Sequence, residues 1–171
     1  ASLISIDPDV AEEVVEDLSV LFRASLNDTS DRPVLLKEEL SLCEKYVHIE
    51  SLRLDDRLVV EWQVSVDTSR VTIPLLTLQP LLENAIYHGI QPLPEGGTVT
   101  VTVSESNKML EIIITNPVAH EDHSYERGNK MALDNTRRRL EAVYGQSASV
   151  TTHQDQETFT TRVKYPLFKD I

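Results

Sequence analysis

Two neighbouring polar residues that could do chemistry, Glu83 and Asn84, lie in the apolar segment LQPLLENAIYHGI, residues 78–90. His88 follows Asn84 by four residues, which places these two side chains on one face of a helix. An amide oxygen can bind Mg²⁺, and a carboxylate beside it can orient or deprotonate an attacking group. A half-buried helix whose Asn84 and His88 bond neighbouring backbone is the simpler explanation of the segment taken alone, so both interpretations stay open.

Glycine use points to the same part of the chain. There are 5 glycines, well below the roughly 7% of residues in an average protein, so each indicates a requirement of the backbone. Gly89 is predicted to close the first helix as its C-terminal cap. Gly128 opens a second segment, GNKMALDN at residues 128–135, which leads into a basic helix.

The apolar pattern predicts the elements that must position these residues. Apolar residues recur at every third or fourth position in the predicted helices and at every second position in the predicted strands. Together the elements predict one two-layer α/β sandwich, in which helices cover one face of a mixed, largely antiparallel sheet. We predict helices over residues 8–26, 36–54, 73–90 with an interruption at Pro80, and 131–145, strands over 58–66, 98–104, 109–116 and a hairpin within 147–166, and a polar loop over 116–130.

The composition excludes several classes of function. The 171 residues include 16 Lys and Arg against 28 Asp and Glu, a net charge of −12, which opposes direct binding to nucleic acid. The single Cys43 excludes an internal disulfide and a cysteine-rich zinc site. No apolar run approaches the roughly 18 residues of a membrane span, so the sequence is typical of a soluble globular protein.

The order of these pieces resembles the ATP-binding domain of sensor histidine kinases, which belong to the gyrase, Hsp90, histidine kinase and MutL superfamily. Within it, the chain is similar to the LytS/YehU-type kinases. Their pattern QPLVENAIKHGI, followed by GxGxGLxN…RL…YG, is matched here by LQPLLENAIYHGI and GNKMALDNTRRRLEAVYG. The resemblance extends over residues 8–166 and implies a Bergerat-type ATPase fold preceded by a remnant dimerisation helix.

The resemblance implies ATP as the nucleotide and Mg²⁺ as the metal ion. It assigns Asn84 to the magnesium that bridges the phosphates, and Glu83 to catalysis, as the group that activates the attacking histidine. His88 and Gly89 would shape the phosphate side of the pocket. Backbone N–H groups at the start of the basic helix would face the triphosphate. The residues of that helix start are Gly128, Asn129, Lys130, Met131, Ala132 and Leu133, and Asn135 matches the asparagine that follows the family's glycine motif.

The chain also departs from the family pattern. The superfamily binds the adenine amino group through the Asp of a DxG turn, and this chain has Asn116 and Pro117 there. An amide accepts the same hydrogen bond, but the loss of charge assistance weakens binding by about 1 kcal/mol. Lys130 and Ala132 stand in place of two family glycines. The threonine that supports adenine in the family could be Thr158, Thr160 or Thr161.

The resemblance divides the chain into residues 1–30, a remnant of the dimerisation and phosphoacceptor region, and residues 31–171, the catalytic ATP-binding domain. None of the histidines lies in a phosphoacceptor motif, so the phosphoacceptor is expected outside this chain: they are His48, His88, His120, His123 and His153. The implied full-length protein is a homodimer that is anchored in the bacterial inner membrane, with this part on the cytoplasmic side. Its implied partner is a response regulator of the LytTR type.

Two functions from different classes fit the sequence. The first is ATP-dependent phosphorylation of a histidine, for relay to the response regulator. The second is a degenerate nucleotide-binding or protein-interaction module that regulates a response regulator without kinase activity. An ATPase clamp of the gyrase or MutL kind is less expected. For the kinase, residues 117–129 are predicted to form a mobile lid that closes when triphosphate binds.

Overall fold

The computed structural model describes residues 7–26, 33–119 and 125–167, and for residues 125–129 it describes the backbone alone. Five strands form the main sheet in the order β2-β4-β5-β7-β6. β2 and β4 are parallel and all other neighbours are antiparallel, which confirms the predicted mixed sheet. The strands are β2 (Leu58–Val64), β4 (Gly97–Ser106), β5 (Met109–Pro117), β6 (Ser149–Gln154) and β7 (Thr158–Pro166).

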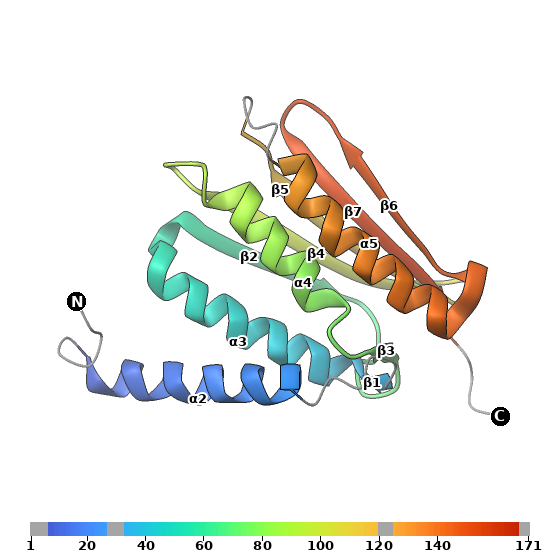
Figure 1. The fold of residues 1–171 in the computed structure, drawn as a ribbon, viewed down its shortest axis with the longest axis horizontal. Coiled ribbons are helices and arrows are strands. Elements are labelled where there is room, and N and C mark those ends of the chain that lie inside the picture. Colours follow the sequence, from blue (N-terminus) through green and yellow to red (C-terminus); the bar gives the residue numbers. More distant parts are fainter. Residues whose placement is uncertain (1–6, 27–32, 120–124, 168–171) are drawn as a thin grey trace.

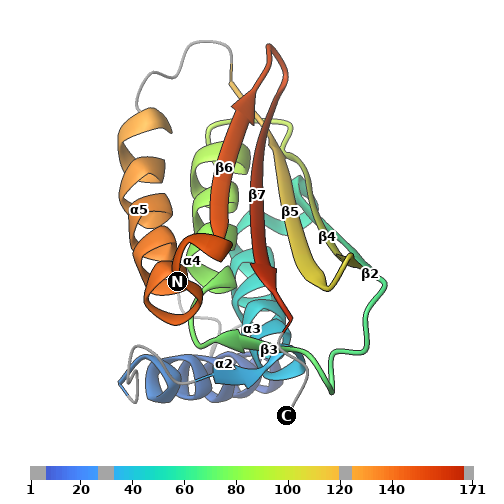
Figure 2. The same cartoon turned by 90° about the vertical axis from the view of Figure 1, so that its right-hand side faces the viewer.

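The helices cover one face of this sheet, so the predicted two-layer α/β sandwich is confirmed (Figures 1 and 2). α4 packs between α3 and α5, and α2 packs against α3. The helices are α2 (Pro8–Leu26), α3 (Leu36–Leu54), α4 (Leu78–Asn84), its continuation η2 (Ala85–Ile90) in π-helical geometry, and α5 (Tyr125–Tyr144). Within the described residues, no helix is long and apolar enough to cross a lipid bilayer.

The core lies between the sheet and the helices. Alternate residues of the central strands point inward, as their period of two predicts: Val101 in β4, Ile112 in β5 and Val163 in β7 are buried. The opposite face of the sheet carries polar residues such as Thr100, and Thr115 beside Thr160 (Oγ1 to Oγ1, 3.5 Å). A sheet with one apolar and one polar face buries a single layer of helices.

A two-stranded antiparallel sheet that the sequence analysis did not predict precedes α3 and α4. β1 (Pro33–Leu35) pairs with β3 (Thr72–Pro74), and Val34 lies opposite Ile73. The predicted helix over residues 73–90 is therefore wrong at its start, because residues 72–74 form a strand and α4 begins at Leu78. α3 follows β1 directly, so the small sheet positions the first turns of both helices.

Two further details of the helix predicted over residues 73–90 need correction. Pro80 is the third residue of α4 and does not interrupt it, because the first turn of a helix has no intrahelical use for its N–H groups. Gly89 lies inside η2 and is not among the described glycines with positive φ, Gly96 and Gly145, so it is not a left-handed cap. Gly145, by contrast, follows α5 with φ +61°, as a C-terminal cap requires.

Helix α5 begins earlier than predicted. Its first residue is Tyr125, so residues 125–130, predicted as loop, have helical backbone. Lys130 and Ala132 replace two glycines of the family pattern, and each replacement favours helix by roughly 1 kcal/mol. The predicted lid over residues 117–129 thus includes helical residues, and its residues 120–124 lie outside the described part of the chain.

Candidate active site

The start of α4 is held by a buried carboxylate. Glu39 of α3 is completely buried. Its Oε2 accepts a hydrogen bond from the N–H of Leu76 (2.9 Å), and its Oε1 accepts from the N–H groups of Leu78 (2.9 Å) and Gln79 (3.2 Å). Because the first N–H groups of a helix have no partner inside it, Glu39 acts as the cap of α4.

The turn before α4 is fixed from two other sides. Leu76 has φ +58°, a left-handed conformation that costs a residue with a side chain roughly 1–2 kcal/mol. Thr77 Oγ1 donates to Pro74 O at 2.6 Å, and the Arg139 guanidinium of α5 donates to Leu75 O. Burial raises the pKa of Glu39, while its three backbone bonds and the charge of Arg139 act in the opposite direction.

Asn84 faces a cavity between α4 and α5. The cavity has a volume of about 300 Å³. The Nδ2 atom of Asn84 is buried and has no hydrogen-bond partner, so no bond to this nitrogen holds the amide in its present rotation, and a flip would exchange Oδ1 for Nδ2. The residues that line the cavity are Leu76, Pro80, Asn84, Met131, Ala132, Asn135, Thr136 and Arg139. Asn84, Met131, Ala132 and Asn135 are predicted site residues that the fold brings together here.

Glu83 faces the other flank of α4, toward α3. Gln79 Nε2 donates to Glu83 Oε1 at 3.0 Å, one helical turn away. The pKa of Tyr46 in α3 is raised by burial and then by the charges of Glu50 and Glu83. The pKa of buried Cys43 is raised by burial and then by the charges of Glu39 and Glu83. The carboxylate of Glu83 is therefore close to α3, while the neighbouring Asn84 lines the cavity toward α5.

The continuation η2 packs against the end of β5. A Cβ atom placed on Gly89 would lie 2.5 Å from Asn116 Nδ2, so the absence of a side chain allows this close approach. Asn116 is 2% exposed, and its Nδ2 donates to Pro117 O at 2.9 Å. His88 is half-buried, with its ring edge-on to Tyr87 at a centroid distance of 4.8 Å. π-helical turns often mark functional sites, and this one brings Gly89 to Asn116.

The fold separates the three candidate threonines. Asn116 pairs with Phe159 across the sheet, and Thr161 pairs with Ile114, two residues along the same inner face. Thr161 is buried there. Thr160 lies on the outer face, and Thr158 bonds Asp155 in the exposed β6–β7 turn. Only Thr161 of the three shares a face with Asn116.

The start of the basic helix differs from the predicted phosphate-binding arrangement. Gly128 and Asn129 lie within α5, as do all residues of the second segment through Asn135. In an α-helix each N–H bonds the carbonyl four residues earlier, so the backbone donors of residues 129–133 are engaged inside the helix. Lys130 and Met131 are exposed, and Leu133 is buried in the core.

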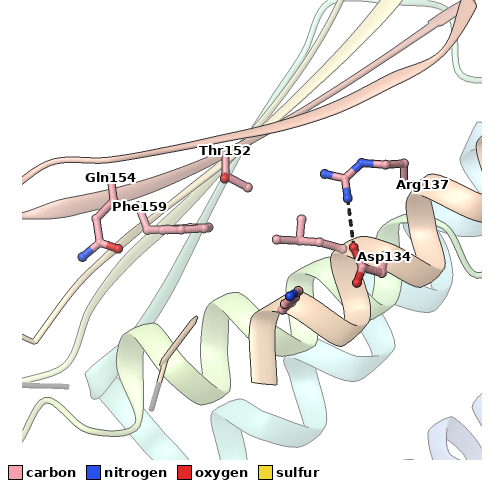
Figure 3. Close-up of a pocket in the computed structure, with 7 residues that line it drawn as sticks. Asp134, Arg137, Thr152, Gln154 and Phe159 are labelled. Carbon is pink, nitrogen blue, oxygen red and sulfur yellow. Dashed lines mark hydrogen bonds and ion pairs between the residues drawn. The ribbon is translucent and has the colours of Figure 1, made fainter. Parts of the chain in front are cut away.

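A second cavity, of about 380 Å³, lies on the other flank of α5, against the β6–β7 hairpin (Figure 3). Arg137 donates through Nη1 to Asp134 Oδ1 (3.0 Å) and through Nη2 to Val150 O (2.9 Å). Of the predicted site residues only Lys130 and Leu133 line this cavity. It is therefore separate from the cavity beside Asn84.

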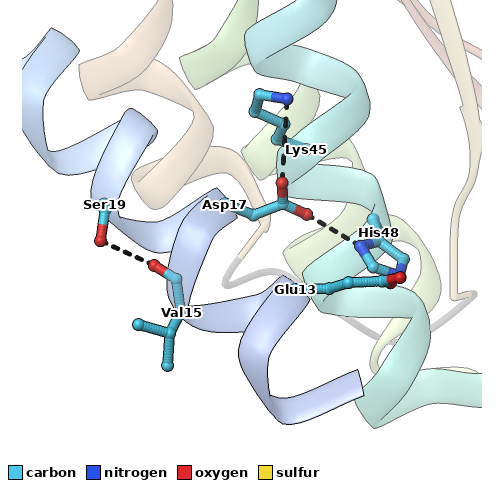
Figure 4. A network of polar contacts seen from close by, with 6 residues as sticks. All are labelled: Glu13, Val15, Asp17, Ser19, Lys45 and His48. Carbon is cyan, nitrogen blue, oxygen red and sulfur yellow. Dashed lines mark hydrogen bonds and ion pairs between the residues drawn. The ribbon is translucent and has the colours of Figure 1, made fainter. Parts of the chain in front are cut away.

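Helix α2 contacts α3 through charged residues (Figure 4), and its apolar residues Val20, Leu21 and Ala24 pack against the core. His48 Nδ1 donates to Asp17 Oδ2 at 2.8 Å, and His48 Nε2 lies 3.8 Å from Glu13 Oε2. Lys45 Nζ lies 3.8 Å from Asp17 Oδ1. His48 is thus a contact between helices, a role that the sequence pattern did not indicate.

Sequence analysis missed two residues that position the site, Glu39 and Gln79. Glu39 lies 37 to 40 positions from the three N–H groups it binds. No local spacing could reveal such a contact. Gln79 is four residues before Glu83 on one helix face, and that spacing was a signal that could have identified it.

The family model described as histidine kinase matches residues 1–58. The sensor histidine kinase YpdA of Escherichia coli (strain K12) is 30% identical over 158 residues, which cover 88% of this chain and 28% of YpdA. The sensor protein LytS of Streptococcus agalactiae (strain 2603 V/R) is 30% identical over 176 residues, which cover 96% of this chain and 30% of LytS. The chain spans less than a third of the length of these relatives.

Solved structures share the fold. The nucleotide-free catalytic domain of histidine kinase ThkA matches with a TM-score of 0.56 at 14% identity, covering 79% of this chain and 94% of that domain. Full-length ShkA in complex with AMPPNP matches with a TM-score of 0.57 at 13% identity, covering 90% of this chain and 35% of ShkA. With the sequence relatives, these matches lead to one conclusion: the chain belongs to the sensor histidine kinase family, and its fold is that of the family's catalytic domain.

Proposed function

We propose that the chain is the catalytic ATP-binding part of a two-component sensor histidine kinase, which transfers the γ-phosphate of ATP to a histidine. The observation that carries the proposal is the pair of adjacent residues on α4. Asn84 lines a cavity and its buried Nδ2 has no hydrogen-bond partner, while Glu83 lies on the flank toward α3 with a hydrogen bond from Gln79. Asn84 can thus contact the nucleotide with its magnesium ion, while the neighbouring Glu83 contacts the attacking histidine.

The side chains fit a magnesium ion that arrives with nucleotide. Mg²⁺ usually takes one or two protein oxygens and completes its shell with phosphates and water. Among the described residues, no three His, Cys, Asp or Glu side chains cluster as a metal site. Asn84, which lines the cavity, would supply one amide oxygen. The ion would offset charge on the phosphates during transfer.

The remaining site residues would bind and orient. Asn116 would accept a hydrogen bond from an adenine amino group, with Thr161 on the same face of the sheet. Gly89 would let η2 approach this base, with His88 toward the phosphates. Lys130, being exposed, would reach a phosphate. Glu83 would take the proton that the attacking imidazole loses.

The rest of the proposed protein follows from the resemblance. Residues 1–30 would be the remnant of the dimerisation region, and residues 31–171 the catalytic domain. In α2, Val15, Leu18 and Phe22 are 60%, 49% and 66% exposed, and a four-helix bundle in a homodimer would cover such an apolar face. The phosphoryl group would pass to a response regulator of the LytTR type. The chain would act at the cytoplasmic side of the bacterial inner membrane.

A second candidate function is supported by the state of α5. The N–H groups of residues 129–133 are engaged in the helix, and Asn116 is almost completely covered, so a nucleotide needs a rearrangement before it can bind as in the kinase proposal. A degenerate module that regulates a response regulator by direct contact would not need this rearrangement. Nucleotide binding discriminates the two.

Calorimetric titration of the chain with ADP and ATP, each with and without Mg²⁺, tests the proposal. We expect heat of binding that depends on Mg²⁺ and that Asn84→Ala removes. At 100 times the dissociation constant, the ligand should also stabilise the fold by about 2.7 kcal/mol. No heat and no change of melting temperature at millimolar nucleotide would favour the interaction module. Gln63→Ala, an amide on the outer face of the sheet, is the matched control.

A further inference from the structure

A line of hydrogen bonds on the α3 side of α4 ends at Glu83. The N–H of Gln79 donates to Glu39 Oε1 at 3.2 Å, and the side-chain Nε2 of Gln79 donates to Glu83 Oε1 at 3.0 Å. Gln79 therefore connects the buried carboxylate that caps α4 with the carboxylate proposed to act in phosphoryl transfer.

The anchor of this line is rigid. Glu39 is 0% exposed and binds three successive backbone donors of the turn and of α4. Arg139 holds the same turn from α5 through Leu75 O. A side chain that leaves α4 within its first turn, as that of Gln79 does, is therefore attached to a backbone with little freedom to move.

The amide of Gln79 is placed at a cost to the fold. Its Oε1 is buried and has no hydrogen-bond partner, and proteins rarely leave a buried acceptor unpaired without a functional reason. An apolar side chain of similar length would avoid this cost. The one bond of the amide, to Glu83, is then the benefit that the amide provides.

We propose that Gln79 is a positioning residue for Glu83 in histidine phosphorylation; the inference rests on the proposed function. In that step an imidazole nitrogen of the phosphoacceptor forms a bond to the γ-phosphorus, and the bond from phosphorus to the β–γ bridging oxygen breaks. ADP leaves with the electron pair, and the proton of the other imidazole nitrogen passes to Glu83. With Oε1 held by Gln79, Oε2 is the oxygen presented to that proton.

Nucleotide binding should not depend on this contact. Gln79 is absent from the residues that line the cavity beside Asn84, and it lies on the opposite flank of α4. A variant at position 79 should therefore change the rate of phosphoryl transfer and leave the affinity for nucleotide as it is. Damage to α4 as a whole would change both.

The experiment measures autophosphorylation of the intact kinase carrying Gln79→Met, which keeps the length of the side chain and removes the amide. We expect kcat to fall about tenfold or more, with KM for ATP and the dissociation constant of ADP unchanged and a melting temperature no lower than that of the wild type. Gln63→Met serves as control and should keep the wild-type kcat. A wild-type kcat for Gln79→Met, or a rise of KM equal to the loss of kcat, would overturn the inference.

A double variant keeps the test valid if Gln79→Met also lowers stability. Because Gln79 acts through Glu83, its substitution in a Glu83→Gln background should cause no further loss of kcat. A further loss of the same size would show a separate role and contradict the inference. If Glu83→Gln alone keeps the wild-type kcat, the proposed role of Glu83 fails instead, so the two failures are distinguishable.

Discussion

The two flanks of α4 are built differently. Toward α3, Glu39, Gln79 and Glu83 form a connected set of hydrogen bonds. Toward α5, Asn84 has an unpartnered nitrogen beside a cavity of about 300 Å³. The difference indicates a division of tasks. The flank that would do proton chemistry is held by hydrogen bonds, and the flank that would receive nucleotide has one amide nitrogen, Asn84 Nδ2, without a partner. Preorganisation is most valuable where charge moves.

The largest expected effect comes from substituting Asn84, on the α5 side of α4. Asn84→Ala should reduce magnesium-dependent autophosphorylation of the intact kinase by about 100-fold or more, as loss of a group that stabilises transferred charge does. The fold should remain, since Nδ2 of Asn84 bonds nothing. Phosphorylation with radiolabelled ATP and a thermal melt check both statements. Normal autophosphorylation would exclude the magnesium role of Asn84.

Substituting Glu39, on the α3 side of α4, should lower the stability of the fold. Glu39→Ala leaves three buried N–H groups without their acceptor, so we expect the free energy of unfolding to fall by about 3 kcal/mol or more. Chemical denaturation of the chain measures this. Glu38→Ala, an exposed neighbour on the same helix, should change stability little, and equal losses for both variants would contradict the cap.

Glu39 also predicts that the stability of the fold depends on pH. Burial raises the pKa of Glu39 above its ordinary value of 4.5. A raised folded-state pKa means that the stability linked to this proton is present below pH 4.5 and is lost as pH rises through the folded value. Glu39→Gln cannot titrate, so the stability of wild type relative to this variant should decline over that interval. A difference that stays constant with pH would contradict the assignment.

The contact between η2 and β5 can be tested by adding a side chain at Gly89. Gly89→Ala places a Cβ atom 2.5 Å from Asn116 Nδ2, and such overpacking costs about 1–3 kcal/mol. Unfolding experiments should show this loss, and Asn116→Ala in the same chain should recover part of it by removing the clashing atoms. Additive losses from the two substitutions would mean that the residues do not meet.

The smallest expected effect concerns α5. Lys130→Gly together with Ala132→Gly restores two glycines and should weaken the start of the helix by about 2 kcal/mol. Amide hydrogen exchange of residues 129–133 should then accelerate. If these N–H groups bind phosphate when released, magnesium nucleotide should bind several-fold more tightly, with Lys37→Gly as control. Unchanged or weaker binding would mean that the helical start of α5 does not limit the affinity of the protein for nucleotide.

Long periodic elements were predictable because local pattern determines them. α2 and α3 have the predicted bounds, and β5 ends within one residue of its prediction. β1 and β3 have three residues each, too few for an alternating pattern to be recognised. The start of α5 lacks the apolar stripe that marks a helix. Of the residues that the motifs selected, Asn84, Met131, Ala132 and Asn135 line one cavity. The cap by Glu39 was missed because it joins residues far apart in the chain.

The turn before α4 has a mechanical consequence. It is attached to α3 through Glu39 and to α5 through Arg139, so α4 cannot slide along its axis without breaking bonds to both neighbours. A force applied through α2 reaches the protein at α3, by way of Asp17 and His48. We expect such a force to turn the three helices of the domain as one rigid body, so that it changes where the site points and leaves the internal shape of the site intact.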